Sequence, residues 1–219
     1  LTVLSGFLVT FSLGFPILPS TTTTVHIVPV ECDDDWIALA DLRFDEWIQD
    51  GTSRDAFRLA TKDLYREERP KSMLFLAKKQ NDEKEELRHH PSNNNGHPDS
   101  PTSMVTMGAA ELSPYELDQA LSKTGPVSAL YVTDVVTDRK FRRQGVARRL
   151  MERVEEHAAA IGTTHLLLHV AYENSSAIHF YGTLGYRVPT LELLSFLDVP
   201  TLEASAGTRG QILLEKRLR

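Results

Sequence analysis

The segment KFRRQGVARRL, residues 140–150, gathers basic side chains around one glycine, Gly145. A β-branched run ends just before it and a helical pattern begins within it, which predicts a strand, a glycine turn and a helix. Such a helix start points free N–H groups and the positive end of its dipole at one spot, and a glycine lets an anion approach the backbone. The segment therefore predicts a site for a phosphate-bearing ligand, with side-chain charge from Arg142, Arg143, Arg148 and Arg149.

Two common phosphate-binding loops do not fit this segment. The sequence has no G-x-G-x-x-G and no G-x-x-x-x-G-K-[ST], so neither a dinucleotide fold nor a P-loop is expected. A basic helix start that is merely solvated is the alternative interpretation, and an R-x-x-G-x-A string on its own does not exclude it.

The composition limits the classes of protein and ligand. The 219 residues hold 24 Lys and Arg against 30 Asp and Glu, a net charge of −6, with 41% hydrophobic residues, which is typical of a globular domain. Because the arginines cluster at one turn of an acidic chain, no nucleic-acid partner is expected. The single cysteine, Cys32, excludes an intramolecular disulfide and a thiolate zinc cluster.

The first 24 residues differ from the rest of the chain. No Asp, Glu, Lys or Arg occurs before Glu31, and the run LTVLSGFLVTFSLGFPIL resembles the apolar part of a targeting signal. We interpret residues 1–24 as a targeting-like leader outside the fold, followed by one domain over residues 25–219. An uncharged leader is compatible with an organelle such as the plastid, and a cytoplasmic location stays open as the alternative.

Hydrophobic periodicity places the elements around the turn. Helices are expected at residues 33–48, 53–68, 145–162 and 174–184, and the first of them to bury Trp36, Ile37, Ala40, Phe44, Trp47 and Ile48. Strands are expected at residues 25–31, 73–79, 104–112, 127–137, 165–170 and 211–218, with Pro29 indicating an edge strand. Early hairpins and late crossovers predict an α/β (α+β) domain, a mixed sheet with helices on both faces.

Residues 81–103 form a polar, Asn-, Pro- and Ser-rich run without periodicity, which predicts a disordered insertion between two strands. His89, His90 and His97 lie in it. They have no cysteine or carboxylate partner at ligand spacing, so we favour a solvated loop and expect no metal site.

Two motifs in the second half of the chain resemble the GNAT superfamily of N-acetyltransferases. The R/Q-x-x-G-x-G/A signature that follows the fourth strand of this family is matched by Arg142, Gly145 and Ala147. Downstream, ENSSAIHFYGTLGYRV matches an asparagine, a small residue, an aromatic pair and a Gly-Tyr strand start, at Asn174, Ala177, Phe180, Tyr181, Gly185 and Tyr186. The resemblance implies the GNAT fold, whose mostly antiparallel sheet splays between the fourth and fifth strands.

The resemblance also implies acetyl-CoA as co-substrate and direct attack of an amine on its thioester. The pyrophosphate would bind the backbone N–H groups of residues 144–148, and the pantetheine arm would pair with residues 135–137. Tyr181 is then the acid that protonates the leaving thiolate. The expected donor contacts are Val135, Val136, Thr137, Arg142, Arg143, Gln144, Gly145, Val146, Ala147, Arg148, Asn174 and Tyr181.

Two further residues narrow the resemblance. By strand alternation Tyr131, Thr133 and Val135 share one face, and His165, Leu167 and His169 share another, so Tyr131 and His169 could meet across the cleft. At these offsets from the motifs the pair resembles the catalytic tyrosine and histidine of protein N-terminal acetyltransferases. That resemblance implies His169 as the base acting through a water, Tyr131 as its partner and Thr133 at the substrate.

The acceptor is the least specified part of the sequence. Residues 189–211 correspond to the hairpin that covers the acceptor in N-terminal acetyltransferases, but they lack its tyrosine cluster. Protein N-termini are the expected acceptors and partners. Lysine side chains, small-molecule amines and a CoA-binding module without catalysis stay open as alternatives, as does a partner subunit. Glu111 is the second choice of base.

Overall fold

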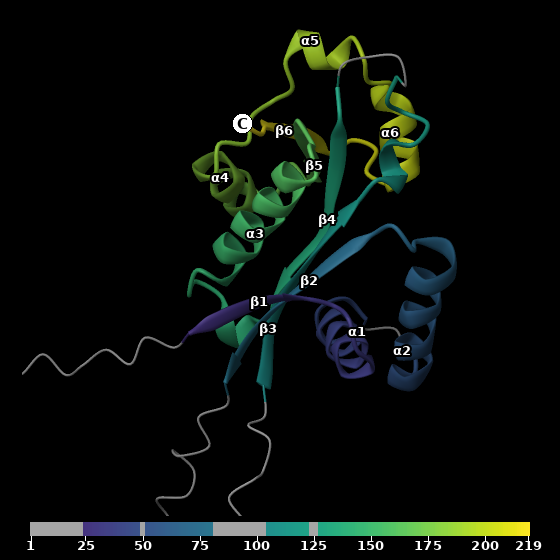
Figure 1. The fold of residues 1–219 in the computed structure, drawn as a ribbon, viewed down its shortest axis with the longest axis vertical. Coiled ribbons are helices and arrows are strands. Elements are labelled where there is room, and N and C mark those ends of the chain that lie inside the picture. Colours follow the sequence, from purple (N-terminus) through teal and green to yellow (C-terminus); the bar gives the residue numbers. More distant parts are fainter. Residues whose placement is uncertain (1–23, 49–50, 81–103, 123–126) are drawn as a thin grey trace, which may run out of the picture.

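The computed structural model describes residues 24–48, 51–80, 104–122 and 127–219. Through them runs one sheet in the order β1-β2-β3-β4-β5-β6 (Figure 1). Only the β4–β5 pair of this sheet is parallel, so the predicted mixed, mostly antiparallel sheet is confirmed. The strands are β1 (Val25–Pro29), β2 (Met73–Gln80), β3 (Met104–Ser113), β4 (Ala129–Thr137), β5 (His165–Val170) and β6 (Ile212–Arg217).

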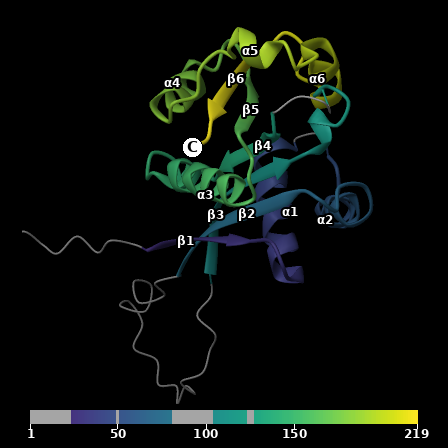
Figure 2. The same cartoon turned by 45° about the horizontal axis from the view of Figure 1, so that its top comes forward.

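The helices follow the predicted order, with additions. The expected ones are α1 (Asp33–Trp47), α2 (Arg54–Asp63) continued by the π-helix η1 (Leu64–Glu68), α3 (Val146–Ala160) and α4 (Ser175–Thr183). The structure adds the 3-10 turns η3 (Tyr115–Leu117) and η4 (Arg139–Phe141) and the short helices α5 (Leu191–Leu194) and α6 (Val199–Ala206). Figure 2 shows α4, α5 and α6 around the end of the sheet that β5 and β6 form.

The hairpin expected over residues 189–211 is wrong, because this segment forms α5 and α6. Its capping residues explain the difference. The Thr190 side chain accepts the Leu193 N–H, and the Asp198 side chain accepts the Thr201 N–H. Each interaction satisfies an N–H group that a helix start leaves free, so the local sequence favours helix over strand.

Helices pack on both faces of the sheet, as predicted (Figure 1). Consecutive residues of β2 divide between the two layers. Phe75 belongs to the cluster under α3, which includes Leu150, whereas Leu76 belongs to the cluster under α1, which includes Leu39. This alternation is what a strand covered on both sides requires.

The face that α1 buries agrees with the prediction only in part. Ile37 and Trp47 are 44% and 45% exposed, whereas Leu39, Leu42 and Arg43 are buried. The helix also packs against α2, and its inner face carries a charged residue that finds partners on the sheet. The stripe chosen by hydrophobicity is therefore right for Ala40, which is fully buried, and wrong for Ile37 and Trp47.

Strands β4 and β5 separate early, which confirms the expected splay. Their pairing runs only from Ala129 opposite His165 to Tyr131 opposite Leu167. Beyond this point β4 continues beside β3 to Thr137, and β5 continues beside β6 to Val170. Backbone groups on the facing edges of the two strands are thus free of sheet partners just beyond Tyr131.

Two predicted segments lie outside the described residues. They are residues 1–23 of the leader and the whole insertion at 81–103, with its three histidines. Within the described ranges, no helix has the length and apolar character needed to cross a membrane.

Candidate active site

A cavity of about 330 Å³ opens where β4 and β5 separate. Strand β4 contributes three of the predicted site residues to its lining, β5 contributes one, and α4 with its cap contributes two. The fold thus brings into one cavity residues that the sequence predicted separately: Tyr131, Thr133, Val135, His169, Asn174 and Tyr181.

The Tyr131 hydroxyl lies 2.8 Å from Nδ1 of His169 inside this cavity. Tyr131 is 3% exposed and packs in the same cluster as Leu167, which fixes its ring. The other ring nitrogen of His169, Nε2, is buried and has no hydrogen-bond partner among the described residues. A buried polar atom without a partner is costly unless a substrate or a water satisfies it.

Burial sets the protonation states of the pair. It lowers the pKa of His169 from its ordinary value of 6.5, against a smaller opposing effect of Glu203, so the imidazole is neutral at pH 7. Burial also raises the pKa of Tyr131 well above its ordinary value, so the phenol keeps its proton. A neutral imidazole can accept one proton at its free nitrogen while its other nitrogen stays hydrogen-bonded to the phenol.

Tyr181 reaches the same cavity from α4. The helix is fixed at its start by Asn174, whose side chain accepts the Ala177 N–H at 3.1 Å. Burial raises the pKa of Tyr181 to about 12, and its ring packs edge-on against Tyr186. Tyr181 is therefore a phenol at neutral pH and holds a proton that it can donate.

The glycine turn has the geometry expected of an anion site. Gly145 has a φ of 79°, a left-handed conformation that favours glycine, and the first helical hydrogen bond joins the Arg149 N–H to the Gly145 carbonyl. The N–H groups of Val146, Ala147 and Arg148 precede that bond and stay available. Beside the turn lies a cavity of about 590 Å³.

Most of the predicted donor contacts line this second cavity: Thr137, Arg142, Arg143, Gly145, Val146, Ala147 and Arg148. Ala177 lines both this cavity and the one around His169, so the two adjoin. Two predicted contacts do not line either cavity. The Gln144 amide donates to the Lys140 carbonyl, and the Val136 side chain packs in the cluster under α1.

The expected alternation along β4 is wrong for Val135. Leu130 and Val132 belong to the cluster under α3, and Val135 packs against that same cluster instead of sharing the face of Tyr131. A β-bulge causes the change, because the register to β3 shifts between Ala109 and Glu111. An extra residue in one strand reverses the faces of the residues after it.

The sequence profile of the acetyltransferase (GNAT) family matches residues 36–186, more than half of the chain. The chain belongs to this family. No curated protein matches its sequence.

Solved structures share the GNAT fold at low identity. A GNAT-family acetyltransferase from Staphylococcus aureus Mu50 has a TM-score of 0.53 at 12% identity and covers 90% of this chain and 100% of its own. An acetyltransferase from Streptococcus agalactiae 2603 has a TM-score of 0.52 at 16% identity, covering 89% and 98%. An N-acetylglutamate synthase from Neisseria gonorrhoeae, complexed with coenzyme A and N-acetyl-glutamate, has a TM-score of 0.51 at 12% identity, covering 91% and 36%.

As a GNAT family member, this protein is an acetyl-CoA-dependent acetyltransferase. The glycine turn fits the donor. A side chain at Gly145 would meet nothing within 4 Å, so the space that a Cβ would enter is open, and the adjoining cavity carries arginines that suit a pyrophosphate.

The sequence missed a third cavity of this GNAT protein, about 530 Å³ in volume. It shares Trp47, Thr133 and Asp134 with the cavity around His169. Arg43 also lines this cavity. The sequence feature that indicates it is an arginine at helical spacing from Leu39 in an otherwise apolar stripe.

Glu111, the second choice of base, is fully buried behind this third cavity. Its carboxylate accepts hydrogen bonds from Tyr65 and Ser72 and pairs with Arg43 and Arg69. Both oxygens of this carboxylate are occupied by these partners, and Glu111 does not line the cavity around His169, so its position indicates a structural role.

Proposed function

We propose that this acetyltransferase acts on the α-amine of protein or peptide N-termini, with His169 as the group that accepts the amine proton. The contact between the Tyr131 hydroxyl and Nδ1 of His169, inside the cavity where β4 and β5 separate, carries the proposal. With Nδ1–H donating to the phenol oxygen, Nε2 is a free acceptor buried in the cavity wall.

The proposed step is direct transfer. The neutral amine attacks the thioester carbonyl carbon, a C–N bond forms and the C–S bond breaks. Before this attack, the ammonium form of the amine loses one proton through a water to Nε2 of His169. As the C–S bond breaks, the Tyr181 hydroxyl gives its proton to the departing thiolate, and the second proton of the nitrogen restores the phenol. The free N–H groups of residues 146–148 bind the pyrophosphate with Arg142, Arg143 and Arg148, and the splayed edge of β4 at residues 135–137 binds the pantetheine arm.

Proton affinity favours an α-amine over lysine. A model α-ammonium has a pKa of about 7.7 to 8.0 and a lysine ammonium about 10.4, while the pKa of His169 lies below 6.5. Proton transfer to His169 is therefore about two to three pKa units less unfavourable from an α-amine. Lysine acetylation follows as a slower side activity at neutral pH.

A matched set of peptides tests the acceptor. Each peptide is assayed with a free N-terminus and no lysine, with an acetylated N-terminus and one lysine, and with both groups free, at varied first residues. We expect turnover to follow the free N-terminus and blocking of it to remove most activity. Spermidine and an amino sugar are assayed in parallel, and acetylation confined to these small amines would contradict the proposal.

A mass-spectrometric measurement identifies the modified nitrogen. In the peptide with both groups free, the fragment that contains the first residue is expected to carry the added acetyl group. Acetyl-CoA binding is measured separately by calorimetry. Binding of acetyl-CoA without transfer to any tested amine would replace the proposed enzyme with a catalytically silent module.

A further inference from the structure

Strand β4 contains a bulge beside the reaction site. Ala109 pairs with Val136 and Glu111 pairs with Thr133, so Asp134 and Val135 together oppose the single residue Ala110. Asp134 has a φ of 54°, in the left-handed region that non-glycine residues rarely adopt. The bulge is thus built on a strained residue that needs support from its surroundings.

The bulge has a direct consequence for the site. Before it, Tyr131 lies on the face opposite to Leu130 and Val132; after it, Val135 has joined their face. Thr133 and Asp134 line both the cavity around His169 and the adjoining third cavity. The bulge therefore sets the direction of the backbone between the proposed catalytic tyrosine and the donor-binding end of β4.

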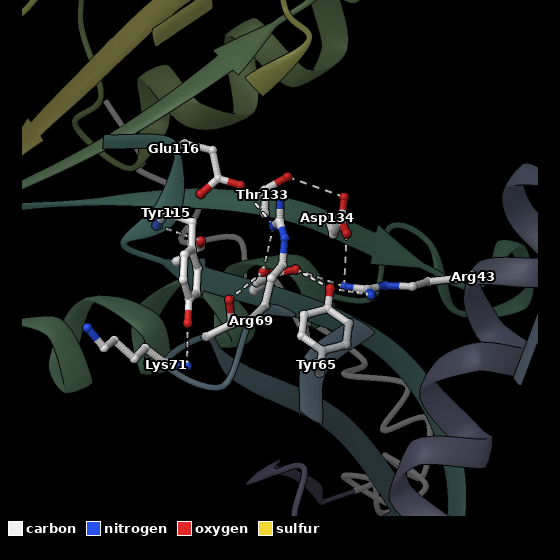
Figure 3. Close-up of polar contacts among 11 residues, drawn as sticks. Arg43, Tyr65, Arg69, Lys71, Tyr115, Glu116, Thr133 and Asp134 are labelled. Atoms are coloured by element: carbon white, nitrogen blue, oxygen red, sulfur yellow. Dashed lines mark hydrogen bonds and ion pairs between the residues drawn. The ribbon is translucent and has the colours of Figure 1, made fainter. Parts of the chain in front are cut away.

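Arg43 of α1 holds Asp134 in this conformation. Its Nη2 lies 3.0 Å from Oδ2 of Asp134 and 3.4 Å from Oε2 of Glu111, and its Nη1 donates to the Tyr65 hydroxyl at 2.7 Å. The guanidinium is 4% exposed, and Figure 3 shows it reaching from α1 to residues of β4 and η1. The Thr133 hydroxyl donates to Oδ1 of Asp134, the carboxylate oxygen that Arg43 leaves free.

The burial of Arg43 makes this contact specific. A guanidinium taken out of water must be paired, and its planar fork fixes the positions of the groups that it pairs with. Glu111 of β3 and Tyr65 of η1 fix the orientation of the Arg43 guanidinium. The guanidinium in turn fixes the position of the Asp134 carboxylate. Through these contacts, α1 and the bulge of β4 are held in a fixed position relative to each other.

We propose that Arg43 and Asp134 are a positioning pair, in which the ion pair holds the left-handed bulge of β4 so that the Thr133–Val135 backbone faces the acyl donor. Neither residue exchanges a proton or touches the reacting atoms in this role. The proposal rests on acetyl transfer, which the family establishes, and not on which amine is the acceptor. Its assay uses whichever amine the enzyme acetylates.

Three substitutions at Asp134 separate conformation from charge. Asp134→Gly removes the carboxylate but adopts a positive φ freely, and Asp134→Asn keeps a side chain that tolerates the left-handed region. Asp134→Ala removes the carboxylate and adds the full conformational cost. We expect kcat to stay within about threefold of wild type for Asp134→Gly and Asp134→Asn and to fall about tenfold or more for Asp134→Ala.

The kinetic constants tell positioning from simple unfolding. The turn at Gly145, with most of the proposed donor contacts, lies outside the bulge, so the KM for acetyl-CoA is expected to rise by a clearly smaller factor than kcat falls in Asp134→Ala. Equal loss in Asp134→Gly and Asp134→Ala would overturn the proposal and make the carboxylate a direct participant. Wild-type kcat in Asp134→Ala would overturn it by making the bulge dispensable.

The role of Arg43 is tested in the Asp134→Gly background. Arg43→Met is made in the wild type and in Asp134→Gly, and its effect on kcat is expected to be clearly smaller in the glycine background, where the bulge needs no support. Equal effects in both backgrounds would contradict the pairing. Arg58→Met is the control, because Arg58 joins α1 to α2 through Asp41 without reaching the sheet. If Arg43→Met does not fold, the Asp134 series decides alone.

Discussion

The Tyr131 hydroxyl and Nδ1 of His169 lie 2.8 Å apart, although 38 residues separate them in the chain. The contact exists because β4 and β5 are paired only as far as Tyr131 and Leu167. Beyond that rung the strands separate, and a tyrosine from one can meet a histidine from the other inside a cavity. Loss of the β4–β5 splay would fill this cavity with backbone hydrogen bonds and leave no room for a substrate.

Removal of the imidazole tests the proposed base. We expect His169→Ala to lower kcat about 10² to 10⁴-fold and Tyr131→Phe to lower it less, because the phenol orients the imidazole without taking the proton. The affinity for acetyl-CoA, measured by calorimetry, should stay near the wild-type value. His165→Ala is the matched control, because His165 lies on the same strand but lines a different cavity. Full activity in both site variants would make the pair a packing contact.

The pH dependence of kcat follows from the lowered pKa of His169. Burial favours the neutral imidazole in the folded protein, so the inactive imidazolium forms only below the ordinary value of 6.5. We therefore expect the acidic limb of kcat below pH 6.5, and its absence from the residual activity of His169→Ala. An acidic limb well above pH 6.5 would assign the titration to another group.

The same shift affects stability. Between the lowered pKa and 6.5 the unfolded chain binds more protons than the folded protein at this histidine, so the free energy of unfolding decreases as the pH falls through that window. Denaturant unfolding at pH 5.5 and pH 7 measures the difference. The decrease should be smaller in His169→Ala, and an unchanged decrease would attribute it to other residues.

Gly145 tests the donor turn. Gly145→Ala places a methyl group in the open space of the turn and strains a φ of 79°, and we expect the Kd for acetyl-CoA to rise about tenfold, the equivalent of roughly one hydrogen bond. Gly162→Ala is the control, since Gly162 has a φ of 81° at the other end of α3 and also meets nothing within 4 Å. Equal Kd changes in the two variants would place the anion elsewhere.

Gly108 tests how β3 packs under α3. A Cβ at this position would lie 2.7 Å from the Val136 carbonyl oxygen and 3.1 Å from side-chain carbons of Leu150 and Val146. We expect Gly108→Ala to lower the free energy of unfolding by about 1 to 3 kcal/mol, measured by denaturant titration. Gly182→Ala, in α4 with nothing within 4 Å, should be neutral or stabilising. Wild-type stability in Gly108→Ala would show that β3 can shift away from α3.

The parts of this fold that depend on neighbours in the chain could be predicted from the sequence. Hydrophobic patterning located every strand and the start of α4 at Asn174, and Gly145 lies in a turn where one was expected, because the conformation of a turn is fixed by its own few residues. The helices over residues 189–211 also have a local cause, since the caps at Thr190 and Asp198 belong to the segment itself.

Tertiary structure alone decided the face of α1, the bulge of β4 and the third cavity. Hydrophobicity ranks Trp47 above Arg43 for burial, but a buried arginine becomes favourable once Glu111 and Asp134 from two other strands surround it. The sequence by itself determined the order of the six strands and of the four predicted helices, the glycine turn before α3 and the two side chains placed to meet. Whether Tyr131 and His169 do meet depends on where two strands part, and that is set by contacts between residues far apart in the chain.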